Sequence, residues 1–359
     1  MKSNYNRIGD YIQLVDERNK GLKVENLLGL SISKQFIPSV ANIIGTDMEN
    51  YKIICKNQFA CSLMQVRRDK KMPVALLKDF DKAIISQAYP VFEVKDTNEL
   101  DPEYLMMWFS RSEFDRETCF HAVGGVRGSL EWEDFCDLKL PIPSIEKQRG
   151  IVEEYNTIQN RITLNQKLIQ KLESTAQAIY KEWFVDVENS TSNIKIGDLF
   201  IPKKGKNITR DEAIEGEYPV IAGGIEPSCF HNSFNTCCPV VTISASGANA
   251  GYVQLHHTNV WASDCSYIDK NVFPEIYFAY VCLKINQSLL MSKQEGTGQP
   301  HIYPEHIVSI PINSFTDDKL KSFNKYCQPI FYGLSNAEKE NQKLKEIKEL
   351  LLSKIAKEN

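Results

Sequence analysis

The sequence predicts an α+β protein in which two similar mixed α/β globules alternate with two long helices that pack as an antiparallel coiled coil. The main observation is an internal repeat. Asn-Gln-Lys-Leu occurs at 165–168 and at 341–344, and Ile-Gly-Asp occurs at 8–10 and at 196–198. A second observation is that each Asn-Gln-Lys-Leu lies in a long charged segment with an apolar stripe. A duplication of this kind favours an internal pseudo-two-fold axis.

Composition limits the classes of function. The chain has 359 residues, is 42% hydrophobic and carries a formal net charge of −4. These values allow about two or three globular domains. They disfavour a protein that coats nucleic acid non-specifically, because such proteins are usually strongly basic. No apolar run reaches the length of a membrane span and no signal segment is evident, so we expect a cytoplasmic protein.

The ten cysteines form no C-x-x-C pair. Zinc sites need paired ligands at short spacing, so we expect no metal site and reduced, buried thiols.

The first globule is expected at residues 1–144. Alternating apolar runs at 51–55, 73–77 and 89–94 predict strands. The segment 102–109 opens with a proline and carries an apolar face, which predicts a helix. The globule is therefore mixed in secondary structure.

A central long helix is expected within 145–189. Ser144 is a good N-cap and Glu146 an acid in the first turn. Its apolar positions step by three and four, which is a heptad pattern. About 40 residues would give a rod of roughly 60 Å. The expected seam consists of Ile151, Tyr155, Ile158, Ile162, Asn165, Ile169 and Leu172.

The second globule is expected at 190–314, after the polar segment 189–193, and a C-terminal long helix at 315–359 with Thr316 as its cap. Ile347 also falls on the stripe of this helix. The expected seam consists of Ile330, Leu334, Asn341, Leu344, Leu351 and Ile355.

The two stripes most simply bury each other. Both helix orientations are topologically possible, and the antiparallel one is favoured because it places the globules at opposite ends. Asn165 and Asn341 either fix the register of the seam or lie at its edge in contact with solvent.

In its motifs the chain resembles the specificity (S) subunits of type I restriction-modification enzymes. The resemblance extends over nearly the whole chain, because the motifs occur in a globule-helix-globule-helix order. The segments that carry it lie at 127–130, 132–135, 165–172, 176–185, 223–228, 242–247 and 261–265.

The resemblance implies that each globule is a target-recognition domain that reads one half of a bipartite double-stranded DNA target. The helices would set the spacing and dock two modification subunits, methyltransferases that use S-adenosylmethionine to methylate adenine. Restriction subunits that use ATP and Mg would join the complex. The chain itself would bind no cofactor and have no catalytic residue. The sequence agrees, because it holds neither a Walker A loop nor an Asn-Pro-Pro-aromatic motif.

Candidate DNA contacts are basic runs and small-residue loops, since lysine and arginine bind phosphate and arginine or glutamine can read base edges. The basic run at 67–71 is expected in a hairpin loop between two strands. The loop at 296–301 is expected where the loop around Arg127 falls in the repeat. The candidates are Arg67, Arg68, Lys70, Lys71, Arg127, Ser129, Lys203, Lys204, Lys206, Ser244, Ser246, Asn249, Thr297, Gln299 and His301.

Three other interpretations stay open. The chain fits equally the specificity subunit of a related system whose partner fuses methylase and nuclease. A non-DNA coiled-coil scaffold with two protein-binding heads would share the layout but lack sequence-selective DNA binding. A catalytic interpretation would use Asp264-Cys265 with His256-His257. The sequence does not reveal the target bases, the spacer length or whether restriction subunits join.

Overall fold

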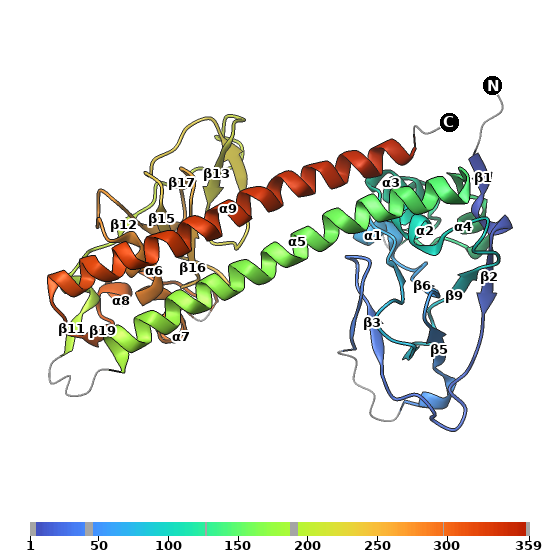
Figure 1. Ribbon diagram of the computed structural model, residues 1–359, viewed down its shortest axis with the longest axis horizontal. Helices are drawn as coiled ribbons and strands as arrows, with labels where there is room; N and C mark the ends of the chain where they lie inside the picture. The colour runs from blue at the N-terminus through green and yellow to red at the C-terminus, as the bar shows by residue number, and fades with distance from the viewer. Residues whose placement is uncertain (1–4, 40–45, 126–127, 187–192, 297, 357–359) are drawn as a thin grey trace. The chain divides into compact units, whose positions relative to one another are not determined.

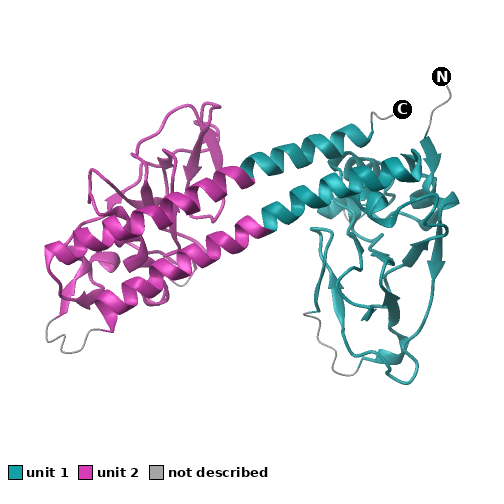
Figure 2. Cartoon of the chain, viewed as in Figure 1, with its two compact units in different colours: residues 1–163, 342–359 teal, residues 164–341 magenta. Residues whose placement is uncertain are grey.

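The computed structural model describes residues 5–39, 46–125, 128–186, 193–296 and 298–356. The chain forms two compact units (Figure 2), which are residues 1–163 with 342–359 and residues 164–341. Two long helices, α5 (Ile145–Tyr180) and α9 (Asp317–Ile355), contribute to both units. The protein is thus mixed α/β with a long central and a long C-terminal helix (Figure 1).

Unit 1 contains ten short strands, four short helices and two 3-10 turns among its described residues. The strands are β1 (Tyr5–Arg7), β2 (Ile12–Val15), β3 (Leu28–Leu30), β4 (Phe36–Pro38), β5 (Lys52–Cys55), β6 (Phe59–Cys61), β7 (Val74–Leu76), β8 (Lys82–Ile85), β9 (Val91–Val94) and β10 (Lys139–Pro141). The helices are α1 (Val66–Asp69), α2 (Pro102–Phe109), α3 (Ser112–His121) and α4 (Trp132–Asp137), and the 3-10 turns are η1 (Ile8–Asp10) and η2 (Met48–Asn50).

Unit 2 has nine strands among its described residues. They are β11 (Asn193–Lys195), β12 (Lys203–Lys204), β13 (Tyr218–Ile221), β14 (Cys229–His231), β15 (Val240–Ser244), β16 (Val253–His256), β17 (Trp261–Ala262), β18 (Cys265–Asp269) and β19 (Pro311–Asn313). Its short helices are α6 (Ile276–Ile285), α7 (Gln287–Met291) and α8 (Pro304–Val308), with a π turn η3 (Lys181–Val185) and a 3-10 turn η4 (Ile196–Asp198).

The two units contain the same antiparallel frame. One four-stranded sheet has the order β2-β9-β6-β7 and the other the order β12-β18-β15-β16. In each unit two short helices follow the sheet, α2 and α3 or α6 and α7. A two-stranded sheet, β1–β10 or β11–β19, then leads into a long helix. The sequence repeat therefore corresponds to a repeat of topology.

The segments inserted into the frame differ. In unit 1 they form the hairpin β3–β4 and the antiparallel pair β5–β8. In unit 2 they form a three-stranded sheet, β14-β13-β17, in which β13 and β17 are parallel. The frame is shared, and the inserted lobes are specific to each unit.

Aromatic side chains fill both cores. In unit 1, Phe59 and Phe92 stack with ring centroids 4.9 Å apart, and Phe109 meets Phe59 edge-on. In unit 2, Phe184 after the end of α5 packs against Phe278 of α6 and Phe323 of α9. Edge-to-face contacts of this kind stabilise beyond simple burial. They fix the adjoining segments of α5 and α9 to the core of unit 2.

Within each unit α5 and α9 pack side by side. In unit 2, Asn165 Nδ2 donates to Glu340 Oε2 at 3.0 Å, and in unit 1 Lys348 Nζ donates to Gln159 Oε1 at 3.0 Å. The predicted seam residues are buried or half-buried, which are Ile151, Tyr155, Ile158, Ile162, Asn165, Ile169, Leu172, Ile330, Leu334, Asn341, Leu344, Leu351 and Ile355.

One residue was wrongly assigned to the apolar stripe of the C-terminal helix. Ile347 is 49% exposed. Lys348 instead lies at the interface of the helices, with its ammonium 5.5 Å from the Tyr155 ring centroid. A long lysine stem can cover apolar surface while its ammonium stays bonded, which the binary pattern of apolar residues does not reveal.

Most element positions agree with the sequence. Ser144 Oγ accepts from Lys147 N at 3.4 Å, and Thr316 Oγ1 accepts from Lys319 N at 3.4 Å, so both expected caps are present. The basic run at 67–71 lies, as expected, in the connection of a hairpin, because β6 and β7 pair antiparallel, and Val66–Asp69 within that connection forms the short helix α1.

Candidate nucleic-acid interface

The basic run of unit 1 does not present four equivalent cations. The short helix α1 lies between two residues in the left-handed region, Gln65 with φ 65° and Lys70 with φ 51°. Arg68 pairs with the neighbouring Asp69 at 2.7 Å. Arg67 turns its guanidinium toward main-chain carbonyls. Lys70 and Lys71 are exposed, and they are the best placed of the four to meet a phosphate.

A tight turn at 123–129 lies beside α1. Val123 N donates to Ser129 O at 2.8 Å, and Ser129 N donates to Val123 O at 2.9 Å. Gly124 has φ +104° and Gly128 φ +46°, conformations that favour glycine. Leu130 N donates to Leu63 O at 2.9 Å and ties the turn to the segment that follows β6. Arg127, a predicted DNA contact, lies outside the described residues.

Unit 2 has the corresponding turn at 295–301. Glu295 and His301 exchange backbone bonds of 3.1 and 2.8 Å, and His301 also forms a bridge with Ser246. His301 stacks on Tyr303, which is 44% exposed. Gln299 is exposed on this turn, and Thr297 lies outside the described residues. The paired loops of the repeat are therefore paired turns in the structure.

The serine side chains at the β15–β16 connection form hydrogen bonds within the protein. Ser244 Oγ donates to Gly223 O at 3.0 Å, and Ser246 Oγ donates to the carboxylate of Asp264. Both side chains are buried, whereas Asn249 is half-buried. Ser244 and Ser246 thus shape the connection that contacts the 295–301 turn, and the predicted DNA contact by their hydroxyls stays untested.

The basic turn of unit 2 lies on an edge strand. Lys203 and Lys204 form β12, which pairs only with β18 among the described strands, and both lysines are exposed. A Cβ at Gly205 would lie 2.2 Å from Ser263 O, so only glycine fits there. Lys206 is exposed and its ammonium lies 6.0 Å from the Trp261 ring centroid. Three cations therefore line one exposed edge of the sheet.

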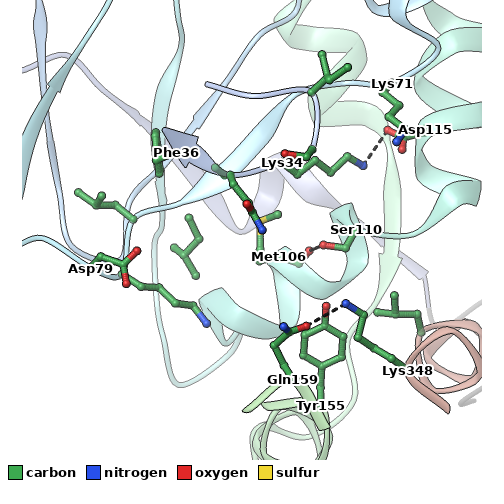
Figure 3. A pocket seen from close by; sticks show the side chains of 18 of the residues that line it. Lys34, Phe36, Lys71, Asp79, Met106, Ser110, Asp115, Tyr155, Gln159 and Lys348 are labelled. Atoms are coloured by element: carbon green, nitrogen blue, oxygen red, sulfur yellow. Dashed lines mark hydrogen bonds and ion pairs between the residues drawn. The ribbon is translucent and has the colours of Figure 1, made fainter. Parts of the chain in front are cut away.

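A cavity of about 690 Å³ in unit 1 was not foreseen from the sequence (Figure 3). Two of the lysines that line it are paired within the protein. Lys34 Nζ lies 2.8 Å from Asp115 Oδ1, and Lys348 bonds Gln159. Burial lowers the pKa of both ammonium groups. The lining comes from five separate stretches of sequence, 32–36, 71–80, 106–115, 155–159 and 348–352, which no local motif connects.

The catalytic interpretation is not supported by the geometry. Cys265 is buried in β18, and burial raises the pKa of its thiol to about 12. A nucleophilic cysteine needs a lowered pKa. His256 Nε2 bonds the Thr242 hydroxyl at 2.8 Å, and Cys265 Sγ contacts Ile221 O.

Two further searches concern only the described part of the chain. None of its helices combines the length and apolarity of a membrane span. None of its His, Cys, Asp and Glu side chains gather in a group of three or more that would suit a metal ion.

Comparison with known proteins points to one family. Residues 62–174 match the family described as the type I restriction modification DNA specificity domain. The specificity subunit of the type I restriction enzyme HindI from Haemophilus influenzae is 29% identical over 143 residues, which are 39% of this chain and 31% of that protein. A putative type I specificity subunit from Mycoplasma pneumoniae is 26% identical over 199 residues, which are 50% of this chain and 53% of that protein.

The matched stretches thus span about a third and about half of the lengths of these two relatives. The fold extends further. The crystal structure of the S subunit of a type I restriction-modification system from M. genitalium has a TM-score of 0.59 at 18% identity, covering 98% of this chain and 95% of that chain. The resemblance in the motifs is confirmed: residues 62–174 match the type I specificity domain, and the chain is similar in sequence and fold to specificity subunits of type I restriction-modification systems.

Proposed function

We propose that this chain is the DNA sequence-recognition subunit of a type I restriction-modification complex, in which each globule reads one half of a bipartite target. The observation that carries the proposal is the repeated frame, β2-β9-β6-β7 and β12-β18-β15-β16, part of which lies in the matched specificity domain. Two similar frames with different inserted lobes suit a protein that reads two different short sequences.

The contacts would divide into two kinds. Lys70 and Lys71 in unit 1, with Lys203, Lys204 and Lys206 in unit 2, would bind phosphate and set orientation. The turns at 123–129 and 295–301 would approach base edges, where a glutamine such as Gln299 can pair with adenine in the major groove. Among the other predicted contacts, Arg127, Ser129, Asn249, Thr297 and His301 belong to these turns or lie beside them.

Net charge argues that the chain does not bind DNA tightly alone. Phosphate contacts dominate affinity and depend on salt, and this chain carries a net charge of −4. Two modification subunits would supply the missing positive surface, S-adenosylmethionine and the methyl transfer to adenine. Restriction subunits would add ATP- and Mg-dependent cleavage. This chain would contribute no catalytic group.

The long helices would set the distance between the half-sites and dock the modification subunits. With 36 and 39 residues, α5 and α9 have lengths of roughly 54 and 58 Å at about 1.5 Å per residue. One turn of B-DNA is about 34 Å. An antiparallel coiled coil along both helices, with an internal pseudo-two-fold axis, would hold the gap constant.

The test is modified-base sequencing in a methylation-free host that expresses this chain with its neighbouring methylase gene. The control host expresses the methylase alone. We expect methyladenine at one split motif only when this chain is present. An assembled complex that produces no new methylation would contradict the proposal and favour the scaffold interpretation. A partner that also carries nuclease motifs would identify the fused methylase-nuclease variant.

A further inference from the structure

Arg67 makes contacts that a DNA-binding arginine would not need. Its guanidinium donates to Gly124 O at 3.1 Å through Nη1 and to Ala122 O through Nη2. Both carbonyls lie at the start of the 123–129 turn. One planar group therefore bridges two acceptors, a geometry in which arginine cannot be replaced by lysine without loss.

The same side chain also contacts the end of the turn. A Cβ built on Gly128 would lie 2.6 Å from Arg67 Cβ, so Gly128 packs directly on the arginine stem. Arg67 thus contacts described residues of the turn both before and after positions 126–127. It belongs to α1, and the left-handed conformation of Gln65 and Lys70 on either side of that helix orients it toward the turn.

The corresponding turn of unit 2 is held differently. Gly247 N donates to Pro300 O at 3.0 Å, and Ile302 N donates to Ala245 O at 2.9 Å. These are main-chain bonds to the β15–β16 connection, and no described arginine contacts the turn. The only charged side chain of the 295–301 turn with a described ionic partner is Glu295, which pairs with His306.

We propose that Arg67 is a positioning residue, which holds the two described flanks of the turn, residues 122–125 and 128–129, in the places from which unit 1 reads its half-site. The inference rests on the proposed function. It reassigns Arg67 from DNA contact to support of the contact loop. Phosphate binding by the basic run 67–71 then falls to Lys70 and Lys71.

The substitution Arg67→Lys separates these roles. Lysine keeps the positive charge and would preserve a phosphate contact, but one ammonium on a flexible stem does not reproduce the planar bridge. The measurement uses the complex with the modification subunits. In the half-site that unit 1 reads, we expect the preference for the most favoured base over the least favoured base to fall at least about tenfold. The other half-site should keep its preference, which provides an internal control.

The readout is modified-base sequencing on a DNA library in which each half-site is randomised in turn. Amide hydrogen exchange at Val123 and Ser129, measured on the full chain, should accelerate in Arg67→Lys. Arg116→Lys is the matched control, because Arg116 is exposed, pairs with Glu113 on the surface of α3 and lies outside the proposed interface. It should change neither measurement.

Unchanged base preference in Arg67→Lys would overturn the inference. So would equal weakening on all sequences, which is the signature of a lost phosphate contact. If Arg67→Lys does not assemble, Gly128→Ala decides, because the added Cβ disturbs the same contact from the other side and should relax the same half-site. A wild-type complex with no sequence preference would instead refute the proposed function, and this inference with it.

Discussion

At the residue scale, two glycines explain why the Ile-Gly-Asp motif occurs twice. A Cβ at Gly9 would lie 2.7 Å from Cys136 Cβ, and one at Gly197 would lie 2.8 Å from Val308 Cβ. The preceding isoleucines, Ile8 and Ile196, are fully buried. In each unit the backbone of the glycine packs against a short helix, α4 or α8. That helix precedes the last strand of the closing sheet, which is the two-stranded sheet β1–β10 or β11–β19. The motif is therefore a packing requirement of the frame.

Gly9→Ala and Gly197→Ala should each lower the free energy of unfolding by about 1–3 kcal/mol, since a methyl group is forced into a filled space. Gly150→Ala is the matched control. Nothing lies within 4 Å of a Cβ at Gly150, which is in the interior of α5, so helix propensity should make that variant up to about 1 kcal/mol more stable. Urea titration of the full chain measures all three. A neutral Gly9→Ala would show that the short helix can move away.

His256 should make unit 2 sensitive to acid. Burial, with a smaller effect of the neighbouring His257, lowers the pKa of His256 from 6.5 to about 4. The folded chain therefore holds a neutral imidazole at a pH where the unfolded chain is protonated. The stabilising contribution is complete above pH 6.5 and is lost as pH falls toward 4, up to about 3 kcal/mol.

The measurement is the difference in unfolding free energy between pH 7 and pH 4.5, for wild type and for His256→Gln. A glutamine oxygen can accept the Thr242 hydroxyl bond in place of Nε2. The variant should lose less stability over this interval than wild type. Equal losses would show that His256 titrates normally in the folded chain.

At the element scale, the sequence predicted long elements and missed local ones. The heptad pattern and the caps located α5 and α9, because a long helix repeats its signal over many turns. The helix α1 has four residues between left-handed flanks, and its conformation depends on Arg67 reaching Ala122 and Gly124. Such contacts link residues more than fifty positions apart and leave no periodic trace in the sequence. The same holds for Lys34 and Asp115 in the cavity.

The two seam asparagines are not equivalent. Asn165 is 3% exposed and bonds Glu340, whereas Asn341 is 7% exposed and its Oδ1 has no hydrogen-bond partner among the described residues. A buried unpaired carbonyl is costly, and polar groups on a seam are retained in some coiled coils because they fix register. We infer that Asn341 lowers the stability of the folded chain and fixes the register of the two helices.

Asn341→Leu should therefore raise the stability of the chain, by about 1 kcal/mol, because an unpaired polar group is replaced by an apolar one. Asn165→Leu should gain less or lose stability, since it removes the bond to Glu340. Thermal unfolding of both variants tests the difference. A destabilised Asn341→Leu would mean that the oxygen has a partner, such as an ordered water.

At the scale of the whole molecule, the chain uses one frame twice and varies what is inserted into it. The shared parts are the four-stranded sheet, the closing sheet and a long helix. The inserted parts differ even in strand direction, since β13 and β17 are parallel and β5 and β8 antiparallel. Under the proposed function, the long helices of the frame would set how far apart the half-sites lie. The inserted lobes together with the turns at 123–129 and 295–301 would decide which bases are read. Spacing and base preference should then change independently.

A matched insertion tests this independence. Seven residues are added to α5 between Thr163 and Leu164, and seven to α9 between Asn341 and Gln342. The Asn165–Glu340 contact of unit 2 and the Gln159–Lys348 contact of unit 1 bracket these points. One heptad preserves the apolar seam and adds about 10 Å of helix. Since about ten base pairs occupy one 34 Å turn, the gap between methylated half-sites should grow by about three base pairs.

Both half-sites should keep their bases, because neither the lobes nor the two turns are altered. Modified-base sequencing of the host reads the gap and the bases together. The control inserts seven residues into α5 alone, which mismatches the helices and should reduce methylation without defining a new gap. If the matched insertion changed the bases or left the gap unchanged, the helices would not act as the spacer. Spacing would then have to come from the partner subunits.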